Sequence, residues 1–284
     1  MEKLLMCFVC FLLLQVKIMA QDVQVQPTPR QMTVKEEGVI TPVSFRLEGE
    51  LEANPQAIRL LKAFLGDCLS SKGLPLYVGE KGDRAVQARK RQIPNQLEGY
   101  YLEITKKGIT LAGNDERGTY YAVRTFMQLF RDNQLPQVEI RDYPDVRFRG
   151  VVEGFYGTPW SHEARLRQLQ FYGENKLNTY IYGPKDDPYH SSPNWRKPYP
   201  EKDAVRLAEL VKVANENEVD FVWAIHPGKD IQWNTTDRDL LMDKFEHMYD
   251  LGVRSFAVFF DDISGEGAKA ERQVELLNYI DDHF

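Results

Sequence analysis

The sequence predicts an α/β protein built from two regions with different rhythms. Up to about residue 143, strand-like and helix-like segments follow one another in irregular order, whereas from residue 144 onward each strand-like run is followed by a helix-like one. Apolar residues make up 43% and charged residues 27% of the 284 residues, which is typical of a folded globular chain. We therefore expect a small α+β accessory domain at 21–143 and a βα-repeat domain at 144–284.

The first twenty residues predict a secretory signal peptide. Lys3 precedes an uncharged apolar run from Leu4 to Leu14, and the small residue Ala20 stands before the expected cleavage point. The run has about a dozen residues, fewer than the roughly 20 that a spanning helix needs. We expect an exported protein, periplasmic or secreted, with no membrane attachment after cleavage. An uncleaved anchor is the alternative.

Charge and cysteine content exclude two further classes. A formal net charge of −6 argues against nucleic acid as a partner, which requires a basic face. Two of the three cysteines lie within residues 1–20, so that cleavage leaves only Cys68. One thiol cannot form an intrachain disulfide. Because Cys68 belongs to an apolar helical pattern, we expect it in the core.

In the first region, each predicted element follows from the spacing of its apolar residues. Between residues 99 and 111 the pattern predicts a hairpin whose turn is Lys106, Lys107 and Gly108, with Gly108 supplying a positive φ. The other expected elements are a strand around Phe45 to Leu51, a helix over 54–69, a strand over 74–78, a helix over 115–130, and a closing strand around Val138 and Ile140.

The second region contains four predicted βα units. Its strands are short and apolar at successive positions, as expected for parallel strands buried on both faces. They cover 148–153, 179–182, 221–225 and 256–260, and the helices cover 161–175, 201–217, 237–251 and 268–282. Ser161 and Thr236 are the expected N-caps, and Gly252 the expected C-terminal stop.

A βα series suits either a doubly wound sheet or a (β/α)8 (TIM) barrel. No GxGxxG sequence follows the first strand, which removes the main dinucleotide signature and favours the barrel. A barrel needs eight units, and only about the first four fit before Phe284. We therefore expect the N-terminal part of a longer protein. A half barrel that dimerises is the alternative, disfavoured because it would expose two sheet edges.

Polar residues follow all four predicted strands, where a barrel carries its active site. Asp261 and Asp262 are the most informative, because two adjacent carboxylates after an apolar strand should raise one pKa and so provide a general acid. Neighbours in one chain do not straddle a scissile bond easily, which favours a mechanism in which the substrate supplies the nucleophile. Capping the next helix or binding Mg²⁺ are the alternatives for such a pair.

Other polar and aromatic residues near these strand ends also have structural interpretations. Lys185 could pair with a neighbouring aspartate at the surface, and Trp160 and Trp195 could serve in packing or in sugar stacking. The five histidines have no metal-ligand spacing, which argues against zinc. Among them, only His226 lies near the predicted rim.

Three segments in order resemble glycoside hydrolase family 84, the β-N-acetylglucosaminidases often called O-GlcNAcases. They are Val151-Val-Glu-Gly-Phe-Tyr-Gly-Thr-Pro-Trp160, Tyr182-Gly-Pro-Lys-Asp-Asp-Pro-Tyr189 and Phe259-Phe-Asp-Asp-Ile-Ser264. The resemblance extends from about residue 22 to the end. The upstream domain looks like the α+β domain that precedes the barrel in bacterial members, a hexosaminidase domain-2-like module.

The resemblance implies a role for each matching residue. Asp262 would be the general acid and base, and Asp261 would bind the acetamide N–H of the substrate. Lys185 and the backbone at Gly154 would hold sugar hydroxyls, and Tyr156 would line the same pocket. The reaction would pass through an oxazoline without metal or cofactor. The other sugar-binding residues of the family come from later strands, which lie outside this sequence.

Two functions follow as hypotheses. The first is a retaining glycosidase that removes terminal β-linked GlcNAc from glycans or glycoproteins by substrate-assisted catalysis. The second is a truncated fragment that binds glycans without catalysis or is inactive. A family 20 hexosaminidase is a lesser alternative, because its acidic pair is Asp-Glu and the pair here is Asp-Asp.

Overall fold

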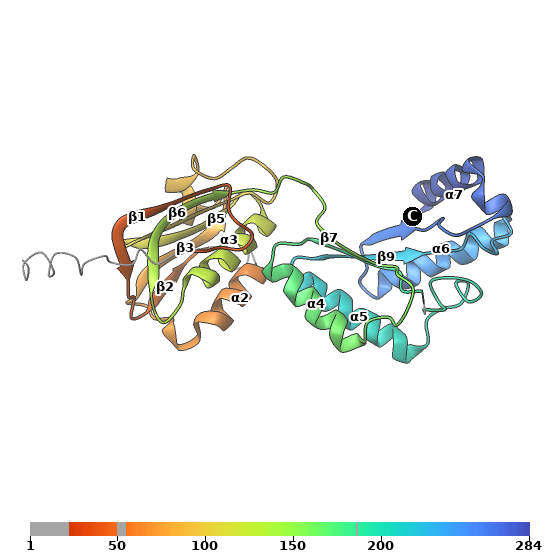
Figure 1. Ribbon diagram of the computed structural model, residues 1–284, viewed down its shortest axis with the longest axis horizontal. Coiled ribbons are helices and arrows are strands. Elements are labelled where there is room, and N and C mark those ends of the chain that lie inside the picture. The colour runs from red at the N-terminus through yellow and green to blue at the C-terminus, as the bar shows by residue number, and fades with distance from the viewer. Residues whose placement is uncertain (1–22, 50–54, 186) are drawn as a thin grey trace, which may run out of the picture.

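The computed structural model describes residues 23–49, 55–185 and 187–284. The predicted signal peptide and Leu51 lie outside these residues. Figure 1 shows two regions lying one after the other along the long axis of the molecule. Within the described ranges, no helix combines the length and the apolar character that crossing a membrane requires.

The first region is a six-stranded mixed sheet with the order β1-β6-β4-β5-β3-β2. The pairs β1–β6, β6–β4 and β4–β5 are antiparallel, and β5–β3 and β3–β2 are parallel. Its elements are β1 (Gln31–Ile40), β2 (Phe45–Glu48), α2 (Pro55–Leu65), β3 (Leu74–Glu80), β4 (Tyr100–Thr105), β5 (Gly108–Gly113), α3 (Glu116–Leu129) and β6 (Leu135–Asp142), with short 3-10 helices at Gly66–Cys68 and Arg84–Arg89.

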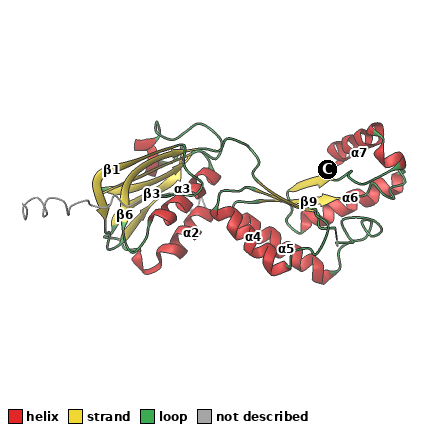
Figure 2. Cartoon of the chain, in the orientation of Figure 1, coloured by secondary structure: helices red, strands yellow, loops and turns green. Residues whose placement is uncertain are grey.

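Residues of the same region cover most of one face of this sheet and part of the other. Figures 1 and 2 show α2 and α3 against one face, where Phe45 and Phe126 are fully buried with ring centroids 6.0 Å apart. On the other face, Val86 and Ile93 form a small cluster with Tyr101 and the neighbouring residues. The large cluster under α2 and α3, with the smaller one on the other face, gives this region a core of its own.

Three details differ from the sequence-based expectations. Strand β1 was not predicted, because its sequence QMTVKEEGVI is largely polar and a bulge between Val34 and Val39 breaks its alternation. Gly108 does not take a positive φ. Instead Thr105 closes the turn, its hydroxyl accepting from Lys107 N at 3.2 Å and donating to Gly108 O at 2.9 Å. Cys68 is partly buried beside the core rather than inside it.

The second region is a four-stranded parallel sheet with the consecutive order β10-β9-β8-β7. Each strand is followed by a helix, as the sequence predicts. The elements are β7 (Gly150–Glu153), α4 (His162–Glu174), β8 (Thr179–Tyr182), α5 (Glu201–Glu216), β9 (Asp220–Ile225), α6 (Thr235–Asp250), β10 (Ser255–Val258) and α7 (Ala270–His283), with a 3-10 helix at Gly265–Ala268.

Local capping signals set the ends of these helices. Ser161 caps α4, its hydroxyl accepting from Ala164 N, and Gly252 follows α6 with a φ of +98°, as predicted. The N-cap of α6 is Asn234 rather than Thr236: its side chain accepts from Asp237 N at 2.9 Å. Both residue types cap well, so sequence type alone could not separate them.

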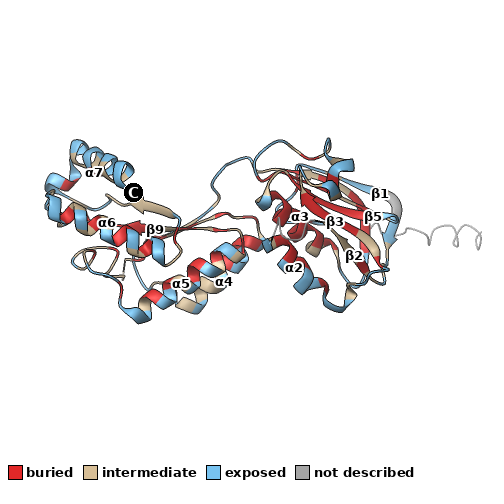
Figure 3. Cartoon of the chain, turned by 180° about the vertical axis from the view of Figure 1, so that it is seen from behind, coloured by how far each residue is buried: buried red, intermediate tan, exposed pale blue. Residues whose placement is uncertain are grey.

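Only one face of the second sheet is well buried, which corrects the expectation of burial on both. Tyr180, Tyr182 and Trp223 are buried in the core shared with the helices. In the row Val152–Ile181–Val222 on the other face, Val152 is 52% exposed and its two neighbours are half-buried. Figure 3 shows the contrast with the first region, where buried residues run along β3, β5 and α3.

A buried polar network joins the two regions. Glu98 accepts hydrogen bonds from Arg149 at 2.5 Å, from Asn178 at 2.7 Å and from Arg117 at 3.1 Å. Arg117 also pairs with Asp220 at 2.8 Å. Arg117 lies in α3 and Glu98 in the loop before β4, both in the first region. Arg149, Asn178 and Asp220 lie at the N-terminal ends of β7, β8 and β9, in the second region. The network therefore links the two regions.

Candidate active site

The parallel sheet brings the ends of its four strands to one edge. Gly183 N donates to Glu153 O at 3.1 Å, and Phe259 N donates to Ile225 O at 2.7 Å, which extends the register beyond the strands. A Cβ on Gly183 would lie 2.4 Å from the ring of Phe259, so any side chain there would require that ring to move. The loops that follow β7, β8, β9 and β10 therefore start close together.

The two carboxylates that follow β10 are directed to different partners. Asp261 forms an ion pair with Lys185, and Asp262 accepts a hydrogen bond from the hydroxyl of Tyr156. The backbone at Asp262 is left-handed, with a φ of +53°, which costs about 1–3 kcal/mol for a residue other than glycine. This unusual conformation separates two side chains that are adjacent in sequence.

Lys185 determines the charge state of Asp261. Its Nζ lies 2.8 Å from Asp261 Oδ2, and the two side chains are 25% and 53% exposed. Partial burial favours the neutral acid, but the hydrogen bond and charge of Lys185 outweigh it, so the pKa of Asp261 lies below its usual value. The sequence predicts a raised pKa for one member of the pair, and Asp261 is not that member, because Lys185 from the loop after β8 supplies a cation that sequence adjacency did not show.

Tyr156 lies on the outer side of this group. Its side chain is 74% exposed, and Lys185 Nζ lies 5.3 Å from its ring centroid. The hydrogen bond to Asp262 and the charge of that carboxylate raise the pKa of Tyr156. The phenol is therefore protonated at neutral pH and acts as a donor to Asp262.

The two glycines of the loop after β7, Gly154 and Gly157, differ in whether the backbone itself favours glycine. Gly157 has a φ of +110°, a conformation that favours glycine. A Cβ on Gly154 would meet Gly183 O at 3.8 Å and Phe259 at 3.9 Å, which is ordinary van der Waals contact. The protein itself leaves room for a side chain at Gly154, so any demand for glycine there would come from a ligand.

His226 is the residue of this edge that sequence reasoning undervalued. Its side chain is buried, and its Nε2 lies 2.6 Å from the backbone oxygen of Asp261 and 3.5 Å from Asp261 Oδ1. The signal was its place directly after the apolar strand β9, which puts it beside the residues that follow β10.

Two other residues near the predicted rim are structural. Glu153 is 1% exposed and accepts hydrogen bonds from Arg165 Nη2 at 2.8 Å, from Arg165 Nε at 2.9 Å and from the hydroxyl of Tyr180. Trp195 is fully buried and donates to Asp230 at 2.7 Å. Neither can contact a sugar in this conformation, which removes the stacking alternative for Trp195.

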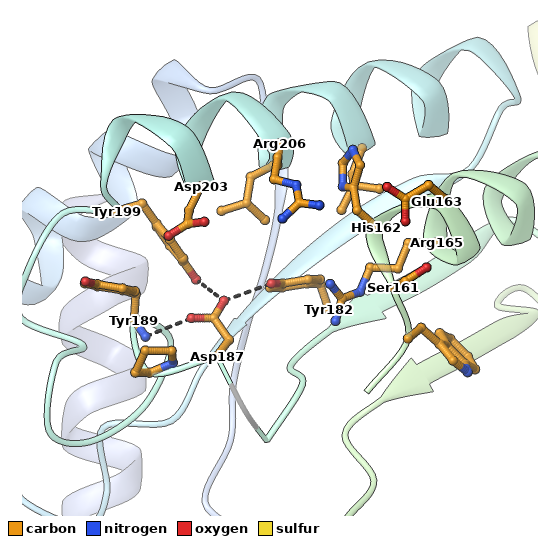
Figure 4. A pocket seen from close by; sticks show the side chains of 14 residues that line it. Ser161, His162, Glu163, Arg165, Tyr182, Asp187, Tyr189, Tyr199, Asp203 and Arg206 are labelled. Atoms are coloured by element: carbon orange, nitrogen blue, oxygen red, sulfur yellow. Dashed lines mark hydrogen bonds between the residues drawn. The ribbon is translucent and has the colours of Figure 1, made fainter. Parts of the chain in front are cut away.

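A cavity of about 400 Å³ lies behind the β8 end of this edge (Figure 4), between α4, α5 and the loop that follows β8. Asp187 points into it and accepts from the hydroxyls of Tyr182 and Tyr199, at 2.9 and 2.8 Å, and from Tyr189 N at 2.8 Å. The lining that the structure describes does not include the Asp261–Asp262 pair. Its residues order the loop that carries Lys185.

The site lacks the features of a metal centre. Among the described residues, no three His, Cys, Asp or Glu side chains are grouped so that they could hold an ion. Asp261 is already paired with Lys185, a cation that competes with any metal for the same oxygen. The arrangement is that of a carboxylate pair with one lysine, one tyrosine and one buried histidine.

Known proteins match both regions. A family model described as beta-N-acetylglucosaminidase matches residues 149–284, and one described as glycosyl hydrolase family 20, domain 2 matches residues 22–143. The protein O-GlcNAcases of Rattus norvegicus and Mus musculus are each 41% identical over 126 residues, covering 44% of this chain and 14% of those proteins. A beta-hexosaminidase of Porphyromonas gingivalis is 25% identical over 158 residues, 49% of this chain and 20% of that protein.

Solved structures match nearly the whole chain. The structure of CpGH84B is 40% identical with a TM-score of 0.86, covering 93% of this chain and 48% of that one. The structure of CpGH84D is 25% identical with a TM-score of 0.81, covering 92% and 48%. The chain therefore spans about half the length of these two proteins and less of the curated relatives. Together with the family models, these matches support a glycoside hydrolase of family 84, an O-GlcNAcase-like protein.

Proposed function

We propose that this chain carries part of the active site of a retaining β-N-acetylglucosaminidase, which removes terminal β-linked GlcNAc from glycans or glycoproteins. The observation that carries the proposal is the division of the carboxylate pair between Lys185 and Tyr156. One acid is held as an anion and the other is left beside a phenol donor. Substrate-assisted hydrolysis requires two such unlike roles at one position.

In the first step, Asp261 accepts the hydrogen bond of the substrate's acetamide N–H. Its lowered pKa keeps it ionised for this purpose. The acetamide oxygen then attacks the anomeric carbon, while the glycosidic C–O bond breaks and Asp262, which enters this step protonated, donates its proton to the departing oxygen. The product of this step is an oxazoline on the substrate in its protonated (oxazolinium) form, which keeps the N–H hydrogen bond to Asp261, with Asp262 now a carboxylate.

In the second step, Asp262 takes a proton from water, which attacks the same carbon and opens the oxazoline with retention. Lys185 and the backbone at Gly154 hold sugar hydroxyls, and Tyr156 lines the pocket beside Asp262. The side chains supply both proton transfers and the substrate supplies the nucleophile, so this scheme uses no metal or cofactor.

We also propose that residues 144–284 form about the first four βα units of a (β/α)8 barrel, preceded by an accessory domain at 21–143. The consecutive strand order supports this, because a doubly wound sheet reverses its order at a switch point. The apolar, partly exposed row Val152–Ile181–Val222 would face the barrel interior. Residues 1–20 would direct export of the protein.

The test is hydrolysis of a chromogenic aryl N-acetyl-β-glucosaminide by this chain and by the product of the same gene read to its natural end. If only the longer protein is active, the site assignment stands and this chain is an inactive or glycan-binding fragment. If neither is active, the proposal fails. In an active protein, fluorination of the acetamide should slow the reaction, and a rate indifferent to it would exclude substrate assistance.

The strongest variant is Asp262→Asn, which should lower turnover by about 10²- to 10⁴-fold because it removes the proton donor. Asp282→Asn is the matched control, since Asp281 and Asp282 form a second adjacent pair that is exposed on α7. Equal activity of the two variants would contradict the role of Asp262.

A further inference from the structure

We propose that His226 is a positioning residue for the carboxylate pair, acting through the peptide unit that joins Asp261 to Asp262. The proposal rests on the function proposed above. Its basis is the contact of a buried imidazole with the backbone between the two acids: His226 is 3% exposed, and its Nε2 lies 2.6 Å from Asp261 O.

The chemistry of this contact fixes the position of one proton. A backbone carbonyl can only accept a hydrogen bond, so Nε2 of His226 must carry the hydrogen and donate it to Asp261 O. The imidazole also lies 3.5 Å from Asp261 Oδ1, on the carboxyl group whose other oxygen meets Lys185. His226 and Lys185 therefore restrain Asp261 from two directions.

The restrained peptide unit leads directly into the unusual backbone of Asp262. The carbonyl that His226 holds belongs to the peptide plane that immediately precedes the left-handed φ of +53°. If that plane were free to rotate, Asp262 could relax to a right-handed or extended conformation and its carboxyl group would leave Tyr156. The hydrogen bond from His226 opposes this relaxation.

His226 is itself held in place by its surroundings. Its backbone N donates to His190 O at 2.7 Å, which ties it to the loop after β8. Two residues later, a Cβ on Gly228 would lie 2.9 Å from Ile263, and a Cβ on Gly267 would lie 2.5 Å from Gly228 O. The backbones of the loops after β9 and β10 are therefore closely packed, which restricts movement of the His226 imidazole.

The kinetic test compares His226→Leu with His226→Gln in the natural-length enzyme, using the aryl glycoside assay. The leucine variant loses the donor, so kcat should fall by roughly 10- to 100-fold, the scale expected for misplaced reacting groups, with KM within about twofold. Glutamine supplies an amide N–H and should restore most of kcat. An unchanged kcat in the leucine variant, or a rise in KM alone, would overturn the proposal.

A matched control separates positioning from general stability. His190 is buried to the same degree, 2% exposed, in the neighbouring loop. His190→Leu should leave kcat within about threefold of the parent protein, and the melting temperatures of both variants measure what each substitution costs the fold. If both variants lose kcat equally, His226 supports only the fold and the proposal is wrong.

A second measurement needs no activity and can use this chain directly. In ¹⁵N-histidine-labelled protein, long-range ¹H–¹⁵N spectra should show His226 as the Nε2–H tautomer with slow proton exchange. An Nδ1–H tautomer or fast exchange would refute the contact. Absence of turnover in the parent enzyme would instead count against the proposed hydrolysis, so the two failures are distinguishable.

Discussion

The two sheets of this protein differ in how completely their own residues cover them. In the first region, α2 and α3 cover one face and the segment around Val86 and Ile93 covers part of the other, and Leu102 and Leu111 are fully buried. In the second region the helices bury one face, whereas Val152 on the other is 52% exposed and no residue of β10 is fully buried. The mixed sheet buries most of its apolar surface with its own helices and loops, whereas a parallel sheet with helices on one face leaves its other face to be covered by something else.

The largest effect is expected from a substitution in the core of the first region. Leu102→Ala, in the centre of β4, should lower the free energy of unfolding by about 3–5 kcal/mol, because it removes buried methyl groups and leaves a cavity. Val152→Ala, in the half-covered sheet, should change it by less than about 0.5 kcal/mol. Urea denaturation of both variants measures the difference. Similar losses would mean that Val152 is covered in solution.

The next prediction concerns the network that holds the two regions together. Glu98→Gln removes the negative charge that two arginines share at this junction and should cost about 2 kcal/mol. Calorimetry should then show the two regions unfolding in separate transitions rather than one.

Arg59→Gln is the control for Glu98→Gln. The Arg59–Glu216 pair also links the two regions, at 3.2 Å, but it is exposed and should contribute less than about 0.5 kcal/mol. A single transition in Glu98→Gln, or equal costs of the two variants, would show that the buried network does not couple the regions.

The last prediction concerns how the stability of the protein changes with pH. Burial raises the pKa of Glu218, which faces Arg117 across the junction, to about 7 from 4.5. The folded state therefore holds this proton more tightly than the unfolded state, and the contribution of Glu218 to stability falls as pH rises from about 4.5 to 7. Glu218→Gln should be more stable than the parent protein by up to about 3 kcal/mol at pH 8, with no difference near pH 4. Thermal melts at both pH values test this, and a constant difference would contradict the raised pKa.

Most elements could be predicted because their signals are local. The apolar period of α2 and α3, the hairpin β4–β5 and the four βα units needed only neighbouring residues, and the structure confirms them within a few positions. Strand β1 escaped prediction because it is a bulged edge strand with few buried residues. The turn at Lys106 and Lys107 was placed correctly but explained wrongly, since a threonine hydroxyl rather than a positive φ closes it.

The features of the candidate site also divide into those that the sequence predicts and those that only the tertiary structure shows. The sequence by itself determined that Asp261, Lys185 and the glycine-rich loop with Tyr156 follow parallel strands, because strand periodicity places them at one edge. Only the tertiary structure determined that Lys185 keeps Asp261 ionised, that Tyr156 donates to Asp262 and that His226 holds the backbone between the two acids. The physical reason is the distance along the sequence over which each feature is determined. An apolar repeat is set by neighbouring residues, whereas the pKa of Asp261 and the hydrogen bonds of the two acids depend on groups that lie 35 to 106 residues away in the sequence.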